Sequence, residues 1–231
     1  MTSRPVPGAP PVAVFCDLDN TLIRGASTFL AGRGLIAQGY VTRRQLRAFA
    51  LDQARFILFG ENTKALSRIQ DAALQLLAGK PSTGLAELMH EPIYERYLAP
   101  RLFRGTIAEL RRRQDAGCDV WIISATAQQI ADELVARQGF TGALATRLEV
   151  CDGKFTGAVD GKVIHGPVKA ERAHRLAAQR GYDLAEAWAY SDSHNDLPLL
   201  EAVGHPVVVN PDRRLNRVAQ ARQWPRLRHR R

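Results

Sequence analysis

The fold is decided near the start of the chain by Val12-Ala13-Val14-Phe15-Cys16 and the residues that follow, Asp17-Leu18-Asp19-Asn20-Thr21. The first five residues are apolar and partly β-branched, and the next five turn polar at once. This pattern is typical of a short buried β-strand that ends in a polar loop. Two aspartates therefore stand directly behind a predicted strand, close enough along the chain to face one ligand.

Three later apolar runs repeat this construction. They cover residues 120–123 before Ser124-Ala125-Thr126, residues 187–190 before Ser191-Asp192, and residues 207–209 before Asn210-Pro211. Helical patterns alternate with them at about 101–116, 127–138, 168–180 and 195–203. Strands that alternate with helices predict an α/β fold built on a doubly wound, Rossmann-like parallel sheet. The segment from Leu144 to Val159 instead alternates around Asp152-Gly153, which predicts a β-hairpin.

The span from about 25 to 100 has no strand-like run and is typical of three or four helices. Its expected helix starts are Thr42 and Asn62 or Thr63, and its expected breaks lie at 60–61, 79–81 and 99–100. A crossover between parallel strands needs only about a dozen residues, far fewer than separate Asp17 from Ser124. The excess predicts an all-helical cap at about 25–100, inserted into a core at about 1–24 and 101–231.

The predicted strand ends carry carboxylates. Ligands of a doubly wound sheet collect at the carboxyl ends of its strands, which places on one rim Asp17, Asp19, Ser124, Asp192 and Asp196. Gathered carboxylates raise one another's pKa unless a cation neutralises them. A small cluster of hard oxygen ligands suits Mg²⁺, which usually meets substrate phosphate. The rim therefore predicts phosphate chemistry.

Four ordered segments carry a family resemblance. They are Asp17-Leu18-Asp19-Asn20-Thr21, Ser124 after an apolar strand, Lys169 at a helix start, and Ser191-Asp192-Ser193-His194-Asn195-Asp196-Leu197-Pro198. Together they resemble the four motifs of the haloacid dehalogenase superfamily across nearly the whole chain. A helical cap between the first two motifs is similar to the phosphoserine-phosphatase-like subgroup. The resemblance implies a Mg²⁺-dependent phosphomonoester hydrolase that acts on a small phosphorylated metabolite.

The resemblance also implies roles for the phosphoryl-transfer residues. Asp17 would attack phosphorus and form an aspartyl-phosphate, and Asp19 would serve as general acid and then as general base. Ser124 would bind a phosphoryl oxygen, helped by the amides of Ala125 and the helix behind it. Lys169 would neutralise charge on Asp17 and on the phosphoryl group. Lys169 is preferred to Lys154 and Lys162 because a helix start follows His165-Gly166-Pro167.

The implied metal ligands are the carboxylates of Asp17 and Asp192 and the backbone carbonyl of Asp19. Asp196 would either bind Mg²⁺ or fix the residues that do, and these alternatives stay open. Asn195 is a candidate for contact with the substrate. Transfer of the phosphoryl group to an alcohol acceptor in place of water also stays open, because the same intermediate would serve both reactions.

The residues behind the first motif argue against an amino-acid substrate. Phosphoserine phosphatases carry an acidic residue there that pairs with the substrate ammonium, but Leu22 to Phe29 contains none. Asn20 also replaces the serine that is usual in those enzymes. The residues that follow instead offer arginines, any of which could contact a second anionic group: Arg24, Arg33, Arg43, Arg44, Arg47 and Arg55. Arg24, seven residues after Asp17, is the nearest candidate.

The formal charge of +9 is concentrated in one segment. Arg213 to Arg231 holds eight arginines and no acidic residue. Nucleic-acid or acidic-membrane binding through this segment is the alternative from another functional class. A final helix packed by Leu215, Val218 and Trp224 explains the same residues, so we expect no stable nucleic-acid partner.

Cysteine content and hydropathy indicate the compartment. Cys16, Cys118 and Cys151 form no CxxC pair, which argues against a disulfide framework and a structural zinc site. The chain has no apolar run of about 18 residues, so no membrane span is expected. These features predict a cytoplasmic protein.

Overall fold

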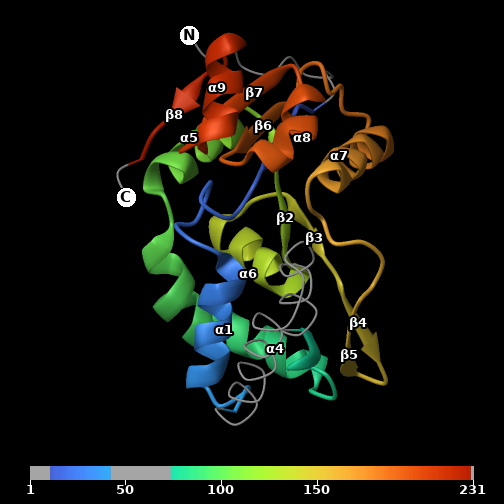
Figure 1. Cartoon of the computed structure of the whole chain (residues 1–231). Coiled ribbons are helices and arrows are strands. Elements are labelled where there is room, and N and C mark those ends of the chain that lie inside the picture. Colours follow the sequence, from blue (N-terminus) through green and yellow to red (C-terminus); the bar gives the residue numbers. More distant parts are fainter. Residues whose placement is uncertain (1–10, 43–73, 230–231) are drawn as a thin grey trace, which may run out of the picture.

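The computed structural model describes residues 11–42 and 74–229, and its centre is a parallel six-stranded sheet (Figure 1). The strands are β1 (Ala13–Cys16), β2 (Asp119–Ala127), β3 (Gly142–Thr146), β6 (Trp188–Ser191), β7 (His205–Val209) and β8 (Arg226–Leu227). Their order is β3-β2-β1-β6-β7-β8, and every pairing is parallel. All four predicted strands are present. β2 and β3 are added on one side of β1, and β6, β7 and β8 on the other. The strand order therefore reverses between β1 and β6, and the switch point for ligand binding lies at the carboxyl ends of these two strands.

Helices cover both faces of the sheet. They are α5 (Arg104–Asp115), α6 (Gln128–Gln138), α7 (Pro167–Arg180), η3 (His194–Asp196), α8 (Leu197–Glu201) and α9 (Arg213–Ala221). Val14 and Cys16 of β1 join the cluster that contains residues of α5 and α6. Ala13 and Phe15 join the cluster that contains residues of α7, α8 and α9. This alternation confirms the doubly wound α/β fold.

Two edge strands were not predicted from the sequence. Leu144 to Thr146, which the sequence assigned to the start of the hairpin, instead belong to β3 and pair with β2. β3 is Gly-Ala-Leu-Ala-Thr, and β8 has only two residues. Both lie at the margins of the sheet, where half-exposed, weakly β-prone residues give no apolar run. Gly142 of β3 also admits the ring of Trp121, because a Cβ there would lie 2.5 Å from Cζ3 of that ring.

The described part of the predicted cap is helical. It contains α1 (Ser27–Ala37), α4 (Ser82–Leu88), the π-helix η1 (Met89–Leu98) and the 3₁₀ turn η2 (Ala99–Arg101). The break at 79–81 occurs as expected, but residues 99–100 do not break the helical run, because η2 continues from η1 through them to Arg101. The helix expected after Thr42, the start at Asn62 or Thr63 and the break at 60–61 lie outside the described residues. The cap boundaries therefore stay predictions.

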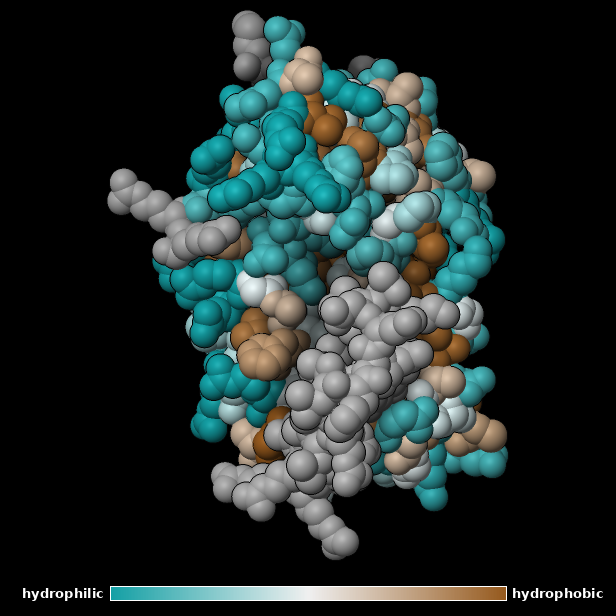
Figure 2. Space-filling view, viewed as in Figure 1, coloured by the Kyte–Doolittle hydropathy of each residue, from teal (hydrophilic) through white to brown (hydrophobic). Residues whose placement is uncertain are grey.

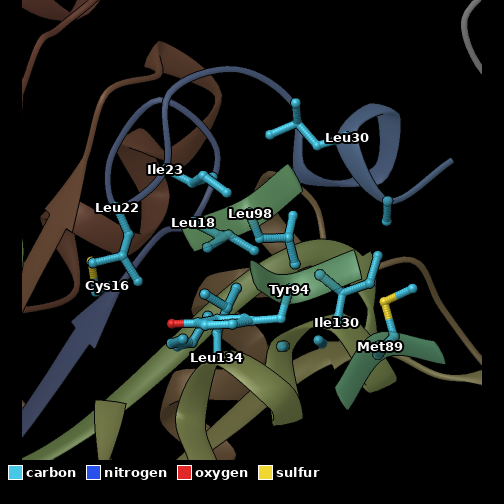
Figure 3. Close-up of a cluster of buried hydrophobic side chains, with 14 of the residues drawn as sticks. Cys16, Leu18, Leu22, Ile23, Leu30, Met89, Tyr94, Leu98, Ile130 and Leu134 are labelled. Atoms are coloured by element: carbon cyan, nitrogen blue, oxygen red, sulfur yellow. The ribbon is translucent and has the colours of Figure 1, made fainter. Parts of the chain in front are cut away.

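One hydrophobic cluster joins the cap to the loop behind β1 (Figure 3). Leu18 and Leu22 of that loop are fully buried, and they pack in the same cluster as Leu30 of α1, Tyr94 of η1 and Leu134 of α6. Full burial of a leucine side chain contributes about 1.5–3 kcal/mol. This packing holds α1 and η1 against the loop that carries the two aspartates.

The predicted hairpin is present and pairs with the cap. Its strands β4 (Leu148–Cys151) and β5 (Lys154–Val159) are antiparallel, and Asp152 and Gly153 take left-handed conformations with φ of 48° and 74°. The N–H of Gly79 donates to the carbonyl of Phe155 at 2.8 Å, and that of Ser82 donates to Gly153 at 2.9 Å. Figure 1 shows the hairpin beside α4. Backbone bonds therefore tie the hairpin to the cap.

The described surface is mainly hydrophilic on the face shown in Figure 2, where hydrophobic residues are scattered. Among the described residues, the exposed large hydrophobic side chains are Phe29 of α1 and Val150 of β4. None of the helices in these parts of the chain has the length and hydropathy that crossing a membrane requires.

Candidate active site

The centre of the candidate site is a buried ion triplet. Asp17 directly follows β1, and its backbone N–H donates to the carbonyl of Tyr190 in β6 at 2.9 Å. Nζ of Lys169 lies 2.5 Å from Oδ1 of Asp17 and 2.6 Å from Oδ2 of Asp196. All three residues are at most 6% exposed. Residues from three separate segments of the chain thus meet at the carboxyl ends of β1 and β6, the edge of the sheet at which the sequence predicted them.

The start of α7 explains the position of Lys169. Gly166 precedes the helix with φ of 55°, a conformation that favours glycine, and Pro167 opens the first turn. Lys169 follows in the same turn and points into the site. The other lysines considered from the sequence are exposed: Lys154 lies on the hairpin, and Lys162 pairs with Glu171 at 3.3 Å.

Two hydroxyl groups, for which the sequence predicted no role, hydrogen-bond to the carboxylates of Asp17 and Asp196 and orient them. Oγ1 of Thr21 donates to Oδ2 of Asp17 at 3.0 Å, and Oγ of Ser191 donates to Oδ2 of Asp196 at 2.7 Å. Both hydroxyl-bearing residues are fully buried. Asp17 therefore has one oxygen held by Lys169 and the other by Thr21. Thr21 stands within the first motif, but only the fold shows which atom its hydroxyl reaches.

Asp19 and Ser124 lie at the contact between the core and the cap. Oδ1 of Asp19 accepts a hydrogen bond from the N–H of Ser27 at 2.8 Å, where α1 begins. Oγ of Ser27 donates to Oγ1 of Thr126 at 3.0 Å. Oγ of Ser124 accepts from the N–H of Thr126 at 3.2 Å. The Ser124 hydroxyl proton therefore remains free to be donated to a ligand.

One local expectation is wrong. The sequence ended the strand at residue 123 and placed Ser124-Ala125-Thr126 in a loop before the helix at 127–138, but β2 continues through these residues to Ala127. The helix itself begins within one residue of the expected position, at Gln128. The reason is continued pairing with β3, with a register shift between Ser124 and Ala127. The carbonyl of Ala125 also accepts from Oγ1 of Thr146 at 2.9 Å. The first amides of α6 therefore follow a bulged strand end.

Three predicted site residues are more open. Asp192 is half-buried, and its carboxylate has no hydrogen bond or ion pair with another residue of the described ranges. Asn195 is exposed, and its N–H donates to Oγ of Ser193 at 3.2 Å. Arg24 is exposed as well. Its backbone N–H donates to the carbonyl of Arg101 at 2.8 Å, while its guanidinium contacts no partner that the structure describes.

The site carries an excess of negative charge. Burial raises the pKa of Asp17 to about 6, with Lys169 opposing the rise and Asp196 adding to it. Burial and then the charges of Asp17 and Asp196 raise the pKa of Asp192 to about 8. Burial also raises the pKa of Asp19. Although burial lowers the pKa of Lys169, its two carboxylate partners raise it, so Lys169 is the site's ammonium ion.

This charge excess fits a divalent cation that prefers oxygen ligands. Within the described ranges, no three His, Cys, Asp or Glu side chains are arranged to hold a metal by themselves. A cation here would therefore depend on two carboxylates, a backbone carbonyl, water and substrate oxygen. That ligand set is typical of Mg²⁺, which keeps several of its waters.

In the absence of metal, we expect the melting temperature to fall as pH rises from about 5 to about 8.5. The folded protein holds protons on Asp17 and Asp192 at pKa values of about 6 and about 8, whereas unfolded aspartate loses its proton near pH 4. The stabilisation is full below about pH 4 and is lost as pH passes through the folded values. Thermal unfolding in EDTA measures this fall.

Asp192→Asn is the comparison for this measurement. It should flatten the part of the fall between about pH 7 and pH 8.5, because the group that titrates there is gone. A wild-type curve parallel to that of the variant over this range would contradict the raised pKa of Asp192.

Asp212 is a site-supporting residue that the sequence reasoning missed. Its Oδ1 caps α9 by accepting from the N–H groups of Arg214 and Leu215, each at 2.8 Å. Its Oδ2 accepts from the N–H of His194 at 2.7 Å, and its own N–H donates to the carbonyl of Asp192 at 2.8 Å. Asp212 thus holds the loop that bears Asp192. An aspartate before a helix signals an N-cap, but not this second contact.

Comparisons with known proteins agree with this geometry. The family model of the haloacid dehalogenase-like hydrolases matches residues 14–201. Phosphoserine phosphatase SerB1 of Mycobacterium tuberculosis is 41% identical over 213 residues, covering 92% of this chain and 69% of that protein. Histidinol-phosphatase of Neisseria meningitidis is 31% identical over 228 residues, covering 93% and 96%.

A solved structure extends the match to the fold. The crystal structure of a Bordetella pertussis protein of unknown function superposes with a TM-score of 0.81 at 28% identity, covering 95% of this chain and 99% of that one. The chain therefore belongs to the haloacid dehalogenase-like hydrolases, in their phosphoserine-phosphatase-like group, and is an enzyme of the phosphatase class.

Proposed function

We propose that this protein is a Mg²⁺-dependent phosphomonoesterase that acts on a small phosphorylated metabolite through an aspartyl-phosphate on Asp17. The observation that carries the proposal is the buried contact of Lys169 with Asp17 and Asp196 at the switch point of the sheet. Family membership supports the class of reaction. The hydrogen bonds around Asp17 support its choice as nucleophile.

Asp17 performs the first displacement. Its carboxylate oxygen forms a bond to phosphorus while the bond from phosphorus to the leaving alcohol oxygen breaks. Water then attacks the aspartyl-phosphate and releases phosphate, so one slow hydrolysis is divided into two easier steps. Lys169 favours the ionised form of Asp17, and Thr21 fixes its second oxygen.

Asp19 moves the protons. Burial raises its pKa, which favours the protonated form that the leaving alkoxide needs in the first step. The resulting carboxylate then takes a proton from the attacking water. The Ser27 N–H bond orients Asp19, and Ser124 donates its hydroxyl proton to a phosphoryl oxygen. The backbone N–H of Ala125 is proposed to donate to the phosphoryl group beside Ser124.

Asp17 and Asp192 would hold Mg²⁺ with the backbone carbonyl of Asp19. The bound ion supplies charge neutralisation at the phosphoryl oxygens. Asp196 serves by orienting Lys169, because its Oδ2 already accepts from both Lys169 and Ser191. This is the reason to prefer the positioning role for Asp196 over direct metal binding.

The test of the proposal is phosphate release from a small aryl phosphate. Purified protein should turn over with Mg²⁺, lose turnover in EDTA and regain it when excess Mg²⁺ is returned. A panel of phosphorylated metabolites then identifies the preferred substrate. Absence of phosphate release from every phosphomonoester in Mg²⁺ would refute the proposal. Glycerol added to the same assay separates hydrolysis from transfer, because a transferase forms glycerol phosphate.

We propose that the substrate carries a second anionic group in addition to its phosphate. Relatives are named for phosphoserine and histidinol phosphate, but Leu22 to Phe29 offers no acidic residue to pair with an ammonium group. Arg24 lies in this segment with an exposed guanidinium. It is positioned in the chain where the core passes into the cap.

Arg24→Ala should lower kcat/KM for the preferred metabolite by about 10- to 100-fold, the usual loss for one charged hydrogen bond. The loss for a small aryl phosphate should be much smaller, since that substrate has no second anion. Arg96→Ala, a change at an exposed arginine of η1 to which no contact with the substrate is assigned, is the matched control. Equal losses on both substrates would assign Arg24 to the phosphoryl group or to the fold.

The arginine-rich segment supports the structural interpretation more than the nucleic-acid one. Leu215 is buried, and Val218 and Trp224 are half-buried. Arg222 pairs with Glu201 at 2.5 Å and lies over the ring of Trp224. We therefore propose a small-molecule substrate without a stable nucleic-acid partner. The three free cysteines support the cytoplasm as the proposed compartment.

A further inference from the structure

The segment that follows α9 returns to the catalytic loop. β8 adds to the sheet beside β7, with Val208 opposite Arg226 and Val209 opposite Leu227. Just beyond β8, the N–H of His229 donates to Oδ1 of Asn210 at 2.8 Å. This pairing brings the His229 side chain to the first turn of α5.

The His229 ring packs against Phe103 and Gly105. It stacks on Phe103 with ring centroids 5.5 Å apart, and it lies against Gly105. A Cβ at Gly105 would stand 2.4 Å from Cε1 and 2.6 Å from Nδ1 of the ring. The backbone of Gly105 is helical, so the absence of a side chain there serves the close approach of the ring.

Hydrogen bonds connect the His229 ring, by way of Thr106 and Thr21, to the proposed nucleophile Asp17. Nε2 of His229 lies 2.8 Å from Oγ1 of Thr106, which donates to the carbonyl of Thr21 at 2.9 Å. Because a carbonyl only accepts, the single Thr106 proton is used there, and Nε2 of His229 must be the donor to Thr106. Thr21 in turn donates to Oδ2 of Asp17 at 3.0 Å.

We propose that His229 is a positioning residue for the reaction, which acts through Thr106 on the backbone of Thr21 and so on the carboxylate of Asp17. The inference rests on the proposed function, because it takes Asp17 as the nucleophile. His229 and Thr106 stand far from the four motifs along the sequence. Their effect should fall on the chemical step, with substrate binding left intact.

His229→Ala should lower kcat by about 10-fold and leave KM within about twofold, since it removes a hydrogen bond that orients the nucleophile. His229→Gln should restore most of the loss, because its side-chain amide nitrogen can donate from nearly the same place. Gly105→Ala should copy His229→Ala, because the added methyl group displaces the ring. Arg228→Ala, a change at an exposed neighbour, is the control and should leave kcat unchanged.

The outcomes separate the inference from the proposed function. An active wild type whose kcat is insensitive to His229→Ala overturns the inference alone. Equal losses for the Ala and Gln variants with a lowered melting temperature also overturn it, in favour of a role in the fold. A wild type without phosphate release refutes the proposed function instead. Independently of activity, ¹⁵N NMR should show His229 protonated at Nε2, and protonation at Nδ1 alone would contradict the hydrogen-bond chain.

Discussion

Replacing Asp17 by Asn should reduce kcat for an aryl phosphate by at least about 10³-fold, because an amide does not attack phosphorus and no other group takes its place. The substitution keeps the shape of the side chain and one oxygen for the hydroxyl of Thr21. It removes the charge that pairs with Lys169 at 2.5 Å. The loss should therefore lie in the chemical step of a folded protein, and steady-state kinetics with a melting curve measures both.

Asp152→Asn is the matched control for this variant. It makes the same chemical change at an exposed turn of the hairpin, where Asp152 has a left-handed φ of 48° that asparagine also tolerates. This variant should keep wild-type kinetics. A rate for Asp17→Asn within about tenfold of wild type would rule out covalent catalysis by Asp17.

Lys169→Met should lower kcat/KM at pH 7 by about 10²- to 10⁴-fold and move the acidic limb of its pH profile upward. The ammonium of Lys169 lowers the pKa of Asp17, which burial has raised to about 6. Without it, Asp17 holds its proton to higher pH and loses the charge that nucleophilic attack needs. The pH dependence of kcat/KM, measured from about pH 5 to 9, tests both effects.

The control for the lysine variant is Lys162→Met. Lys162 is exposed, and its pairing with Glu171 at 3.3 Å is a surface ion pair, worth at most about 1 kcal/mol. An unchanged acidic limb in Lys169→Met would mean that Lys169 does not set the ionisation of Asp17. Unfolding of that variant would be recognised by its melting curve, and Lys169→Arg then provides the kinetic comparison with the positive charge retained.

The sheet was predictable where strands are buried on both faces. The runs that became β1, β2, β6 and β7 are apolar from end to end, since helices cover both sides of each strand. β8 gave no such signal because it contains only Arg226 and Leu227 at an edge. The bulge at Ser124 was also hidden, because it depends on pairing with β3 and not on the residues of β2 themselves.

The site was predictable to the extent that its residues follow strands or open helices. Asp17 and Asp192 meet because parallel strands end at one rim, and Lys169 joins them from the first turn of α7. Nothing in the sequence near Thr106 or Asp212 predicted that these side chains hydrogen-bond to the loops that carry the site. Each contacts the backbone of a loop remote in sequence, and neither residue type announces such a contact locally.

The backbone bonds between the hairpin and residues 79–82 bear on how this enzyme can be re-engineered. Any swing of the cap that keeps those bonds must carry the hairpin along, so the flexible joints would include the connections on either side of β4 and β5 as well as those on either side of the cap. A chimera whose imported segment does not place N–H groups where those of Gly79 and Ser82 lie would leave the carbonyls of Phe155 and Gly153 without their backbone partners. Transplanted specificity should therefore succeed only when helices and hairpin are exchanged together.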